Sequence, residues 1–219
     1  MEADPMSLPA AARNMSNVPA SAGAAAAVGA LSDAAAASLE SALARAQRGE
    51  LAAFRELIRA YQDIVYTLAL RMLKVPEDAE ELAQDVFVSV HQHLGKIASA
   101  THLLFWLRRT VCHRAIDRLR RRPLHQVVPL DSVEEVPLSD ASRDRDPLLE
   151  RRLRELVSRL PPMARAVVLL KFQEDLDPTE IAETLGMPLN TVKSHLKRSL
   201  ASLRAGCEGL RPISEGGPS

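Results

Sequence analysis

The chain has 219 residues, enough for one mid-sized domain or two small ones, and 47% of them are hydrophobic while only 3% are aromatic. Its 28 basic and 28 acidic residues give a formal net charge of zero, which argues weakly against a nucleic-acid-binding protein. The charges are segregated, however: seven arginines and one acid lie between positions 104 and 122, and five acids without a base lie between 77 and 85. A basic stretch of this kind is a local docking surface and has to be judged locally.

Several classes of protein are excluded by what the sequence lacks. The two cysteines, Cys112 and Cys207, are far apart and show no metal-ligand spacing, so we expect free thiols and neither a zinc site nor a disulfide. There is no glycine-rich phosphate loop, no nucleophile–histidine–acid constellation and no metal-ligand cluster, so we expect no enzyme, no cofactor and no metal. No apolar stretch of about 18 residues exists, and the Ala-rich run at 20–37 is too weakly hydrophobic for a signal peptide. The sequence therefore predicts a cytoplasmic protein without membrane insertion.

The first part of the chain predicts a tail followed by helices. Residues 1–38 carry almost no bulky side chains and cannot offset the entropy of ordering, so they are predicted to be a disordered Ala-rich tail. From 39 to 122 apolar residues recur at spacings of three and four, first along 54–72, then along 82–94 and again along 104–119. Val75-Pro76 separates the first two stretches, because proline ends one helix and opens the next. This pattern predicts a first domain of three or four packed helices.

The second part of the chain predicts a linker and a second helical domain. Residues 123–147 contain four prolines, many acids and no helical period, which is typical of a flexible linker. Helical spacing resumes over 148–205, and 206–219 are predicted to be a frayed tail. The expected fold class is therefore all-α, with two small helical domains joined by a flexible linker.

A helix-turn-helix is predicted between Pro178 and Arg198. Ile181 and Leu185 lie on the inner face of a first helix, Gly186 supplies the left-handed turn, and Asn190 suits the N-cap of a second helix. Its inner face is formed by apolar residues: Val192, Leu196, Leu200 and Leu203.

The outer face of that second helix has the composition of a recognition helix, which offers donors to base edges and cations to phosphates. The candidate DNA-binding residues are Asn190, Thr191, Lys193, Ser194, His195, Lys197 and Arg198. The alternative is a helical hairpin with a solvated basic face, and a histidine such as His195 is, taken alone, more often a plain surface residue.

Three blocks in order resemble one known family. Residues 78–87 (DAEELAQDVF), residues 105–122 with their Phe-Trp-Leu-Arg-Arg and Ala-Ile-Asp-Arg-Leu-Arg-Arg-Arg stretches, and residues 160–194 match in type and separation. Over about Leu51 to Arg204 the chain resembles the sigma-70 family of bacterial RNA polymerase, specifically its extracytoplasmic-function (ECF) group. The resemblance implies an alternative sigma factor with region 2 over 39–122, for core polymerase and the −10 element, and region 4 over 148–205, for the −35 element.

The resemblance also implies roles for residues of the first domain. Glu81, Gln84 and Asp85 match the region that docks on a coiled coil of the largest catalytic subunit; without the resemblance they would be interpreted as a solvated helix face. The implied −10 contacts come from the Arg-rich helix, which can neutralise phosphates: Trp106, Arg108, Arg109, His113, Arg114, Arg118, Arg120 and Arg121. For Trp106 core packing is the alternative to base stacking.

The chain departs from the family in two places. A loop at 97–102 lacks the aromatic-Arg-Gly-like stretch that members often use for base capture, and His113 stands where many have Asn.

The acids of the linker could also cover Arg118–Arg122 in the free protein, with a solvated spacer as the alternative.

The implied partners are core RNA polymerase, through its largest and second-largest catalytic subunits, promoter DNA and an anti-sigma factor. Two other functions stay open. A LuxR-type helix-turn-helix regulator would suit residues 191–196 but needs an α/β receiver that the chain lacks, and a helical adaptor would make no DNA contact.

Overall fold

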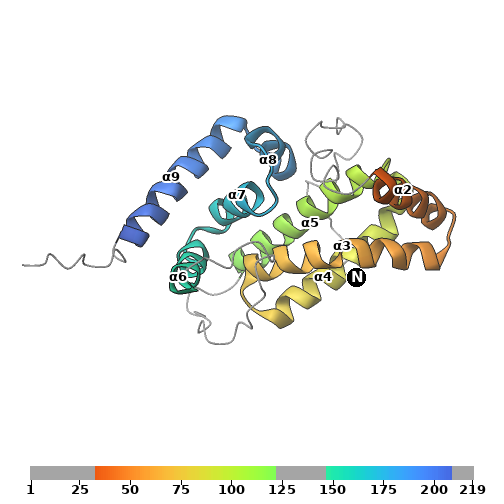
Figure 1. Ribbon diagram of the computed structural model, residues 1–219, viewed down its shortest axis with the longest axis horizontal. Helices are drawn as coiled ribbons and strands as arrows, with labels where there is room; N and C mark the ends of the chain where they lie inside the picture. Colours follow the sequence, from red (N-terminus) through yellow and green to blue (C-terminus); the bar gives the residue numbers. More distant parts are fainter. Residues whose placement is uncertain (1–32, 122–146, 209–219) are drawn as a thin grey trace, which may run out of the picture.

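The computed structural model describes residues 33–121 and 147–208, and within these ranges the protein is built of helices and contains no strand. The N-terminal unit consists of α2 (Asp33–Gln47), α3 (Leu51–Leu73), α4 (Pro76–His93), the short 3₁₀ helix η2 (Leu94–Lys96) and α5 (Ala100–Arg121). The C-terminal unit consists of α6 (Pro147–Ser158), α7 (Pro162–Phe172), α8 (Pro178–Leu185) and α9 (Leu189–Glu208). The all-α class expected from the sequence is confirmed (Figure 1).

The ends of the predicted segments shift by a few residues. Helix α2 begins at Asp33 and so includes residues 33–38, which the sequence interpretation placed in the tail. Helix α9 continues to Glu208, three residues into the predicted C-terminal tail. The predicted linker lies outside the described residues apart from Pro147, which opens α6. The acids of the linker, for which covering Arg118–Arg122 and a solvated spacer were both left open, lie outside the described residues as well.

The junction between α3 and α4 is set by backbone chemistry at two residues. The apolar stripe of α3 is buried as predicted, with Leu57, Val65 and Met72 at most 2% exposed. The helix ends where Lys74 turns left-handed with φ 67°, and its N–H donates to the Leu70 carbonyl at 2.8 Å. Pro76 then occupies the first turn of α4, where its missing N–H leaves no hydrogen bond unmade. The sequence predicted the break at Pro76 but gave no sign of the left-handed lysine.

The start of α5 is capped by side chains from elsewhere in the N-terminal unit. The Ser99 hydroxyl accepts from the His102 N–H at 3.0 Å, and a Glu40 carboxylate oxygen accepts from the Ala100 N–H at 2.8 Å. The Tyr61 hydroxyl donates to the Ala100 carbonyl at 3.2 Å. Residues 100–102 therefore belong to α5, and the prediction of a loop over 97–102 was wrong for its second half because these caps extend the helix.

The helix-turn-helix forms where the sequence predicted it, with one shift in its caps. Asp177 and Glu180 make a reciprocal capping box at the start of α8, in which the Asp177 carboxylate accepts from the Glu180 N–H at 2.9 Å. Gly186 ends α8 in the left-handed conformation with φ 64°, as predicted. Helix α9 begins at Leu189, so Asn190 lies inside the first turn and is not the N-cap; that prediction was wrong because the preceding Pro188 already breaks the chain.

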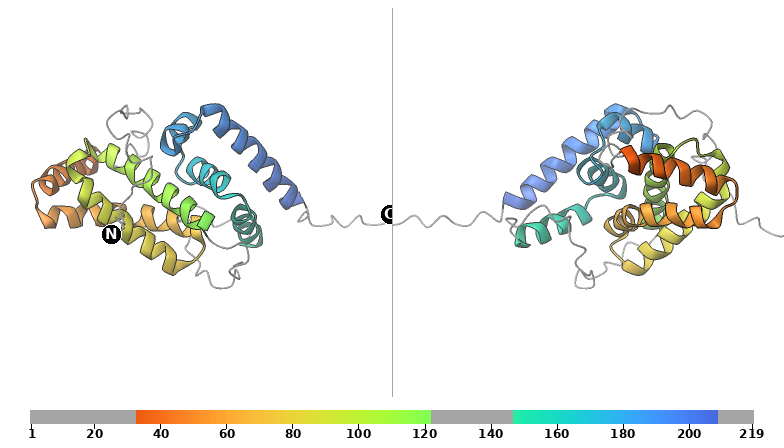
Figure 2. Two further views of the ribbon diagram at one scale, coloured as in Figure 1. Left: turned by 180° about the vertical axis from the view of Figure 1, so that it is seen from behind. Right: turned by 45° about the vertical axis from the view of Figure 1, so that its right-hand side comes forward.

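The two units lie directly against one another. Helix α5 packs against α7 and α8, and α3 packs against α7. Both views in Figure 2 show α7 between α9 and the N-terminal unit, with α9 on the outer side. Buried residues of the C-terminal unit belong to the same hydrophobic cluster as the core of the N-terminal unit: Ala166, Val167, Leu170, Ile181 and Val192.

Within residues 33–121 and 147–208 none of the helices combines the length and apolar character needed to cross a membrane.

Candidate nucleic-acid interface

The N-terminal half of α5 faces the C-terminal unit. Arg108 is 4% exposed, and both its Nε and an Nη atom lie 2.8 Å from Oε2 of Glu174, whose side chain is 6% exposed. Arg109 is half-buried, and its Nη1 donates to the carbonyls of Glu183 and Thr184 at 2.9 and 3.3 Å. These carbonyls belong to the last turn of α8, where helical C=O groups lack an i+4 partner, and that of Glu183 also accepts from the Gly186 N–H at 3.3 Å. The Arg109 guanidinium therefore adds a side-chain cap to the C-terminal end of α8. The first two arginines of the predicted −10 surface are thus engaged inside the protein.

Trp106 lies in the core, at 8% exposure, with its ring centroid 6.1 Å from that of His93. This position favours the packing alternative over base stacking. His113, two turns further on, is half-buried, and its Nδ1 donates to the Arg109 carbonyl at 2.9 Å. Burial lowers the pKa of the His113 imidazole below its usual range, and the carbonyl hydrogen bond raises it by less. We therefore expect His113 to be neutral at pH 7.

The C-terminal half of α5 reaches the surface. Arg118 pairs with Asp85 at 2.7 Å and with Glu81 at 3.3 Å. Arg114 donates to the Ser89 hydroxyl, and burial lowers its pKa. Arg120 and Arg121 are exposed, and Arg120 is 3.9 Å from the carboxylate of Asp117. The free basic end of α5 is therefore shorter than the sequence suggested.

The predicted polymerase-docking residues share one exposed face of α4. Glu81, Gln84 and Asp85 are all exposed, as their spacing of three and four on a helix predicts. Glu81 and Asp85 both form ion pairs with Arg118 of α5. The structure thus brings the docking candidates and one −10 candidate together in a single exposed charge network on α4 and α5.

Helix α9 presents the clearest basic surface. Asn190, Thr191, Lys193, Ser194, Lys197 and Arg198 are exposed, and His195 is half-buried. Ser194 donates to the Asn190 carbonyl at 2.8 Å, and Arg198 Nε donates to the Ser194 carbonyl at 3.2 Å. A shallow hollow is lined by Ser194, Lys197, Arg198 and Ala201. Over the described parts of the chain, the cations of this face form no ion pair with a carboxylate, so their charge is available to a polyanion.

Four cations meet where α3 ends against the C-terminal unit; we call them the cation cluster: Arg71, Lys74, Arg154 and Arg165. Arg165 is 7% exposed, and its guanidinium donates to the carbonyl of Met72 across the seam and to that of Ser158. Burial lowers the pKa of Lys74 to about 8, helped by the repulsion of the three arginines.

Sequence reasoning missed the residues that join the two units. Glu174 lies in the turn after α7, where Asp175 has φ 51°, and local pattern gave no reason to single it out. Arg165 was likewise overlooked. A buried charge on the apolar helix 162–172 was the one available signal, since such a charge needs a partner.

Across the described ranges no group of three or more His, Cys, Asp or Glu side chains is arranged to hold a metal ion. The arrangement is that of a binding protein with a basic helix-turn-helix and a second, partly covered basic helix.

Comparison with known proteins assigns this arrangement to a family. The family model "Sigma-70 region 2" matches residues 57–123, and "Sigma-70, region 4" matches residues 150–203. Sigma-E factor of Streptomyces coelicolor is 33% identical over 157 residues, covering 71% of this chain and 86% of the relative. ECF sigma factor SigM of Mycobacterium tuberculosis is 30% identical over 155 residues, covering 71% and 77%, and SigW of Bacillus subtilis is 26% identical over 180 residues, covering 72% and 90%. Among solved structures, CnrH in complex with the cytosolic domain of CnrY has a TM-score of 0.58 at 21% identity, over 78% of this chain and 98% of that one, which shows the shared fold.

The fold and the matched regions define a promoter-recognition subunit of bacterial transcription. The chain belongs to the sigma-70 family and, within it, to the ECF sigma factors. It is an alternative sigma factor that works with RNA polymerase on promoter DNA to initiate transcription. The LuxR-type alternative finds no support in these matches.

Proposed function

We propose that α9 recognises the −35 element, that α5 contributes to the −10 element, and that the exposed face of α4 docks on core polymerase. The observation that carries the proposal is the outer face of α9, the helix that follows the Gly186 turn. Lys193, Lys197 and Arg198 are exposed there and form no ion pair with an acid of residues 33–121 or 147–208. A helix in this position enters the major groove with its first turns, and its cations reach base edges or phosphates.

Arg198 tests base recognition by α9. Its Nε donates to the Ser194 carbonyl of its own helix, and within the described ranges Arg198 has no ion pair that it would have to break to move onto DNA. We expect Arg198→Ala to cost about 1–3 kcal/mol in promoter binding and to relax the preference at one base pair. Binding titrations on a set of single-base −35 variants make the measurement. If Arg198→Ala weakened binding equally on every −35 sequence, Arg198 would contact a phosphate, and the proposal that it recognises a base would be wrong.

Polymerase docking is proposed for Glu81, Gln84 and Asp85, on a coiled coil of the largest catalytic subunit, with contacts to the second-largest subunit elsewhere. Because these side chains are exposed and none is in the core, the triple change to Ala should abolish co-purification with core polymerase and leave helical circular dichroism unchanged. Glu77→Ala with Glu80→Ala, also exposed on α4 and acidic, is the matched control. If the triple variant co-purified with core polymerase as well as the wild type does, the proposal that these three residues form the docking surface would be wrong.

An anti-sigma factor is proposed as the regulatory partner and the cytoplasm as the location, where polymerase and promoters meet. Support comes from membership of the ECF group and from CnrH, which shares the fold and was solved with the cytosolic domain of CnrY. Pull-down from cells with the tagged full chain, followed by run-off transcription with and without the captured protein, tests this partner. A captured protein that leaves transcription unchanged would not be an anti-sigma factor.

A further inference from the structure

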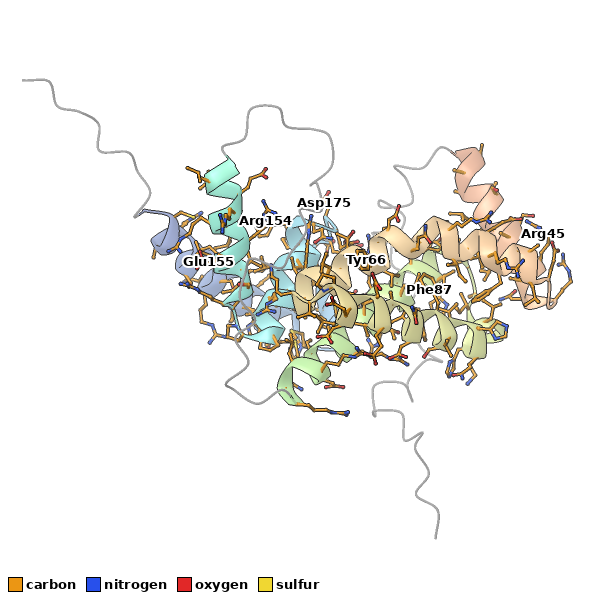
Figure 3. The ribbon with its side chains drawn as sticks, turned by 90° about the horizontal axis from the view of Figure 1, so that it is seen from below. Arg45, Tyr66, Phe87, Arg154, Glu155 and Asp175 are labelled. Atoms are coloured by element: carbon orange, nitrogen blue, oxygen red, sulfur yellow. The ribbon has the colours of Figure 1, made fainter. Side chains whose placement is uncertain are left out.

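The cation cluster at the end of α3 draws its four positive charges from both units. Arg71 lies in the last turn of α3 and Lys74 follows that helix, while Arg154 belongs to α6 (Figure 3) and Arg165 to α7. Lys74 Nζ lies 3.5 Å from the carbonyl oxygen of Arg154, and Arg165 Nη1 donates to the carbonyl of Met72, two residues before Lys74. These contacts hold the side chains of the cluster in a single place, where α3 meets α6 and α7.

Within the described parts of the chain, acids do not balance the positive charge of the cluster. Every charge that shifts the pKa of Lys74 there belongs to one of the three arginines of the cluster, and each of them lowers it. Glu174 is the acid whose charge reaches Arg71, but its carboxylate already pairs with Arg108 at 2.8 Å. The backbone carbonyls that accept hydrogen bonds from the cluster carry only partial charges, so they do not cancel four cations. The cluster therefore attracts an anion.

Arg165 also keeps one unpaired donor inside the described structure. The residue is 7% exposed, and its two Nη atoms donate to the carbonyls of Met72, Ser158 and Leu160. Its Nε is buried and has no hydrogen-bond partner among residues 33–121 and 147–208. Buried polar groups in proteins nearly always have a partner, because a donor left without an acceptor loses its hydration and gains nothing in return. An oxyanion at the cluster would supply both the acceptor that this Nε lacks and the charge that the four cations lack.

We propose that the cation cluster is a binding site for the phosphate group of a small molecule, held at the end of α3 between the two units. A phosphate carries up to two negative charges, and its oxygens accept from several directions, which suits cations that come from three helices. Arg71, Lys74 and Arg154 are half-buried, so the cluster is recessed but still reached by solvent. A recessed site admits a small anion, whereas a DNA duplex needs an exposed face such as that of α9. The ligand is therefore distinct from promoter DNA, and its binding is a further property beside promoter recognition.

Calorimetric titration of the full chain with pyrophosphate, at constant ionic strength, tests this site. Pyrophosphate supplies linked phosphate groups without a sugar or a base. The wild-type chain should bind it at one site per chain. Lys74→Met, which keeps the length of the side chain and removes its charge, should weaken binding about tenfold or more, as expected for one charge-assisted hydrogen bond. Arg154→Met removes a cation of the opposite unit and should weaken binding to a similar extent. Lys96→Met, the same change at an exposed lysine of η2 outside the cluster, should leave the affinity unchanged.

A wild-type chain that does not bind pyrophosphate, or that binds it no better than Lys74→Met does, would overturn the proposal. Lys74→Met should remain folded, because it replaces a half-buried charge by an apolar side chain, and unchanged helical circular dichroism checks this. If that variant lost its helical signal, the affinity of a folded Arg154→Met would decide between the two results.

A DNA duplex without promoter elements identifies the source of the phosphate. Lys74→Met should leave the affinity for this duplex unchanged, because the duplex binds elsewhere. A loss of duplex affinity as large as the loss for pyrophosphate would assign the cluster to the DNA backbone and overturn the small-molecule site.

Discussion

The substitution Gly186→Ala, which adds a single methyl group, tests whether the turn of the helix-turn-helix is left-handed. Gly186 has φ 64°, a conformation that costs a residue with a Cβ about 1–2 kcal/mol. A Cβ built at this position would meet the Arg109 guanidinium nitrogens at 3.5 and 3.8 Å, which is ordinary contact. Gly186→Ala should therefore lose stability through backbone strain and not through a clash.

Gly95 supplies the matched control. It lies in η2 without a left-handed φ, and a Cβ there would have nothing within 4 Å. Both Gly→Ala changes reduce the entropy of the unfolded chain equally, by about 0.4–1 kcal/mol, so this contribution cancels between them. The free energy of unfolding, from denaturant titration followed by circular dichroism, should be lower for Gly186→Ala than for Gly95→Ala by about 1–2 kcal/mol.

The same variant reports on function, because Gly186 sets the angle at which α9 leaves α8. Asn tolerates the left-handed region, so Gly186→Asn should retain more stability and more −35 affinity than Gly186→Ala. If the two Ala variants proved equally stable, the turn would not be held left-handed in solution, and the placement of α9 derived from it would be wrong.

Two further predictions follow from burial. Burial lowers the pKa of Lys74 to about 8 from an ordinary 10.5, so between these two pH values the unfolded chain binds more protons than the folded protein, and raising the pH from about 8 toward 10.5 should increase the contribution of this group to the free energy of unfolding. Lys74→Met should abolish this contribution, measured by denaturant titration at several pH values, and a difference between the two proteins that does not change with pH would contradict the reasoning. Cys112 is fully buried and burial raises the pKa of its thiol, so a thiol reagent should modify Cys207 in the native protein and reach Cys112 only in denaturant. Equal reaction rates in the native protein would refute the buried placement.

Local physics explains what the sequence determined by itself. The helical periods, the proline at 76 and the glycine at 186 act within a few residues of their own position, so the all-α class, the break between α3 and α4 and the left-handed turn could all be predicted. The exposed face of α9 and the shared face of Glu81, Gln84 and Asp85 follow from the same spacing rule.

The tertiary structure alone decided which arginines of α5 are free. Arg108 and Arg120 look equivalent in the sequence, yet Arg108 is 4% exposed and the side chain of Arg120 is 62% exposed. The difference arises from Glu174, which lies 66 positions away along the chain, beyond the reach of any helical period. Burial of a charge is decided by the partner that long-range packing brings to it, and for Arg108 that partner is a residue of the opposite unit.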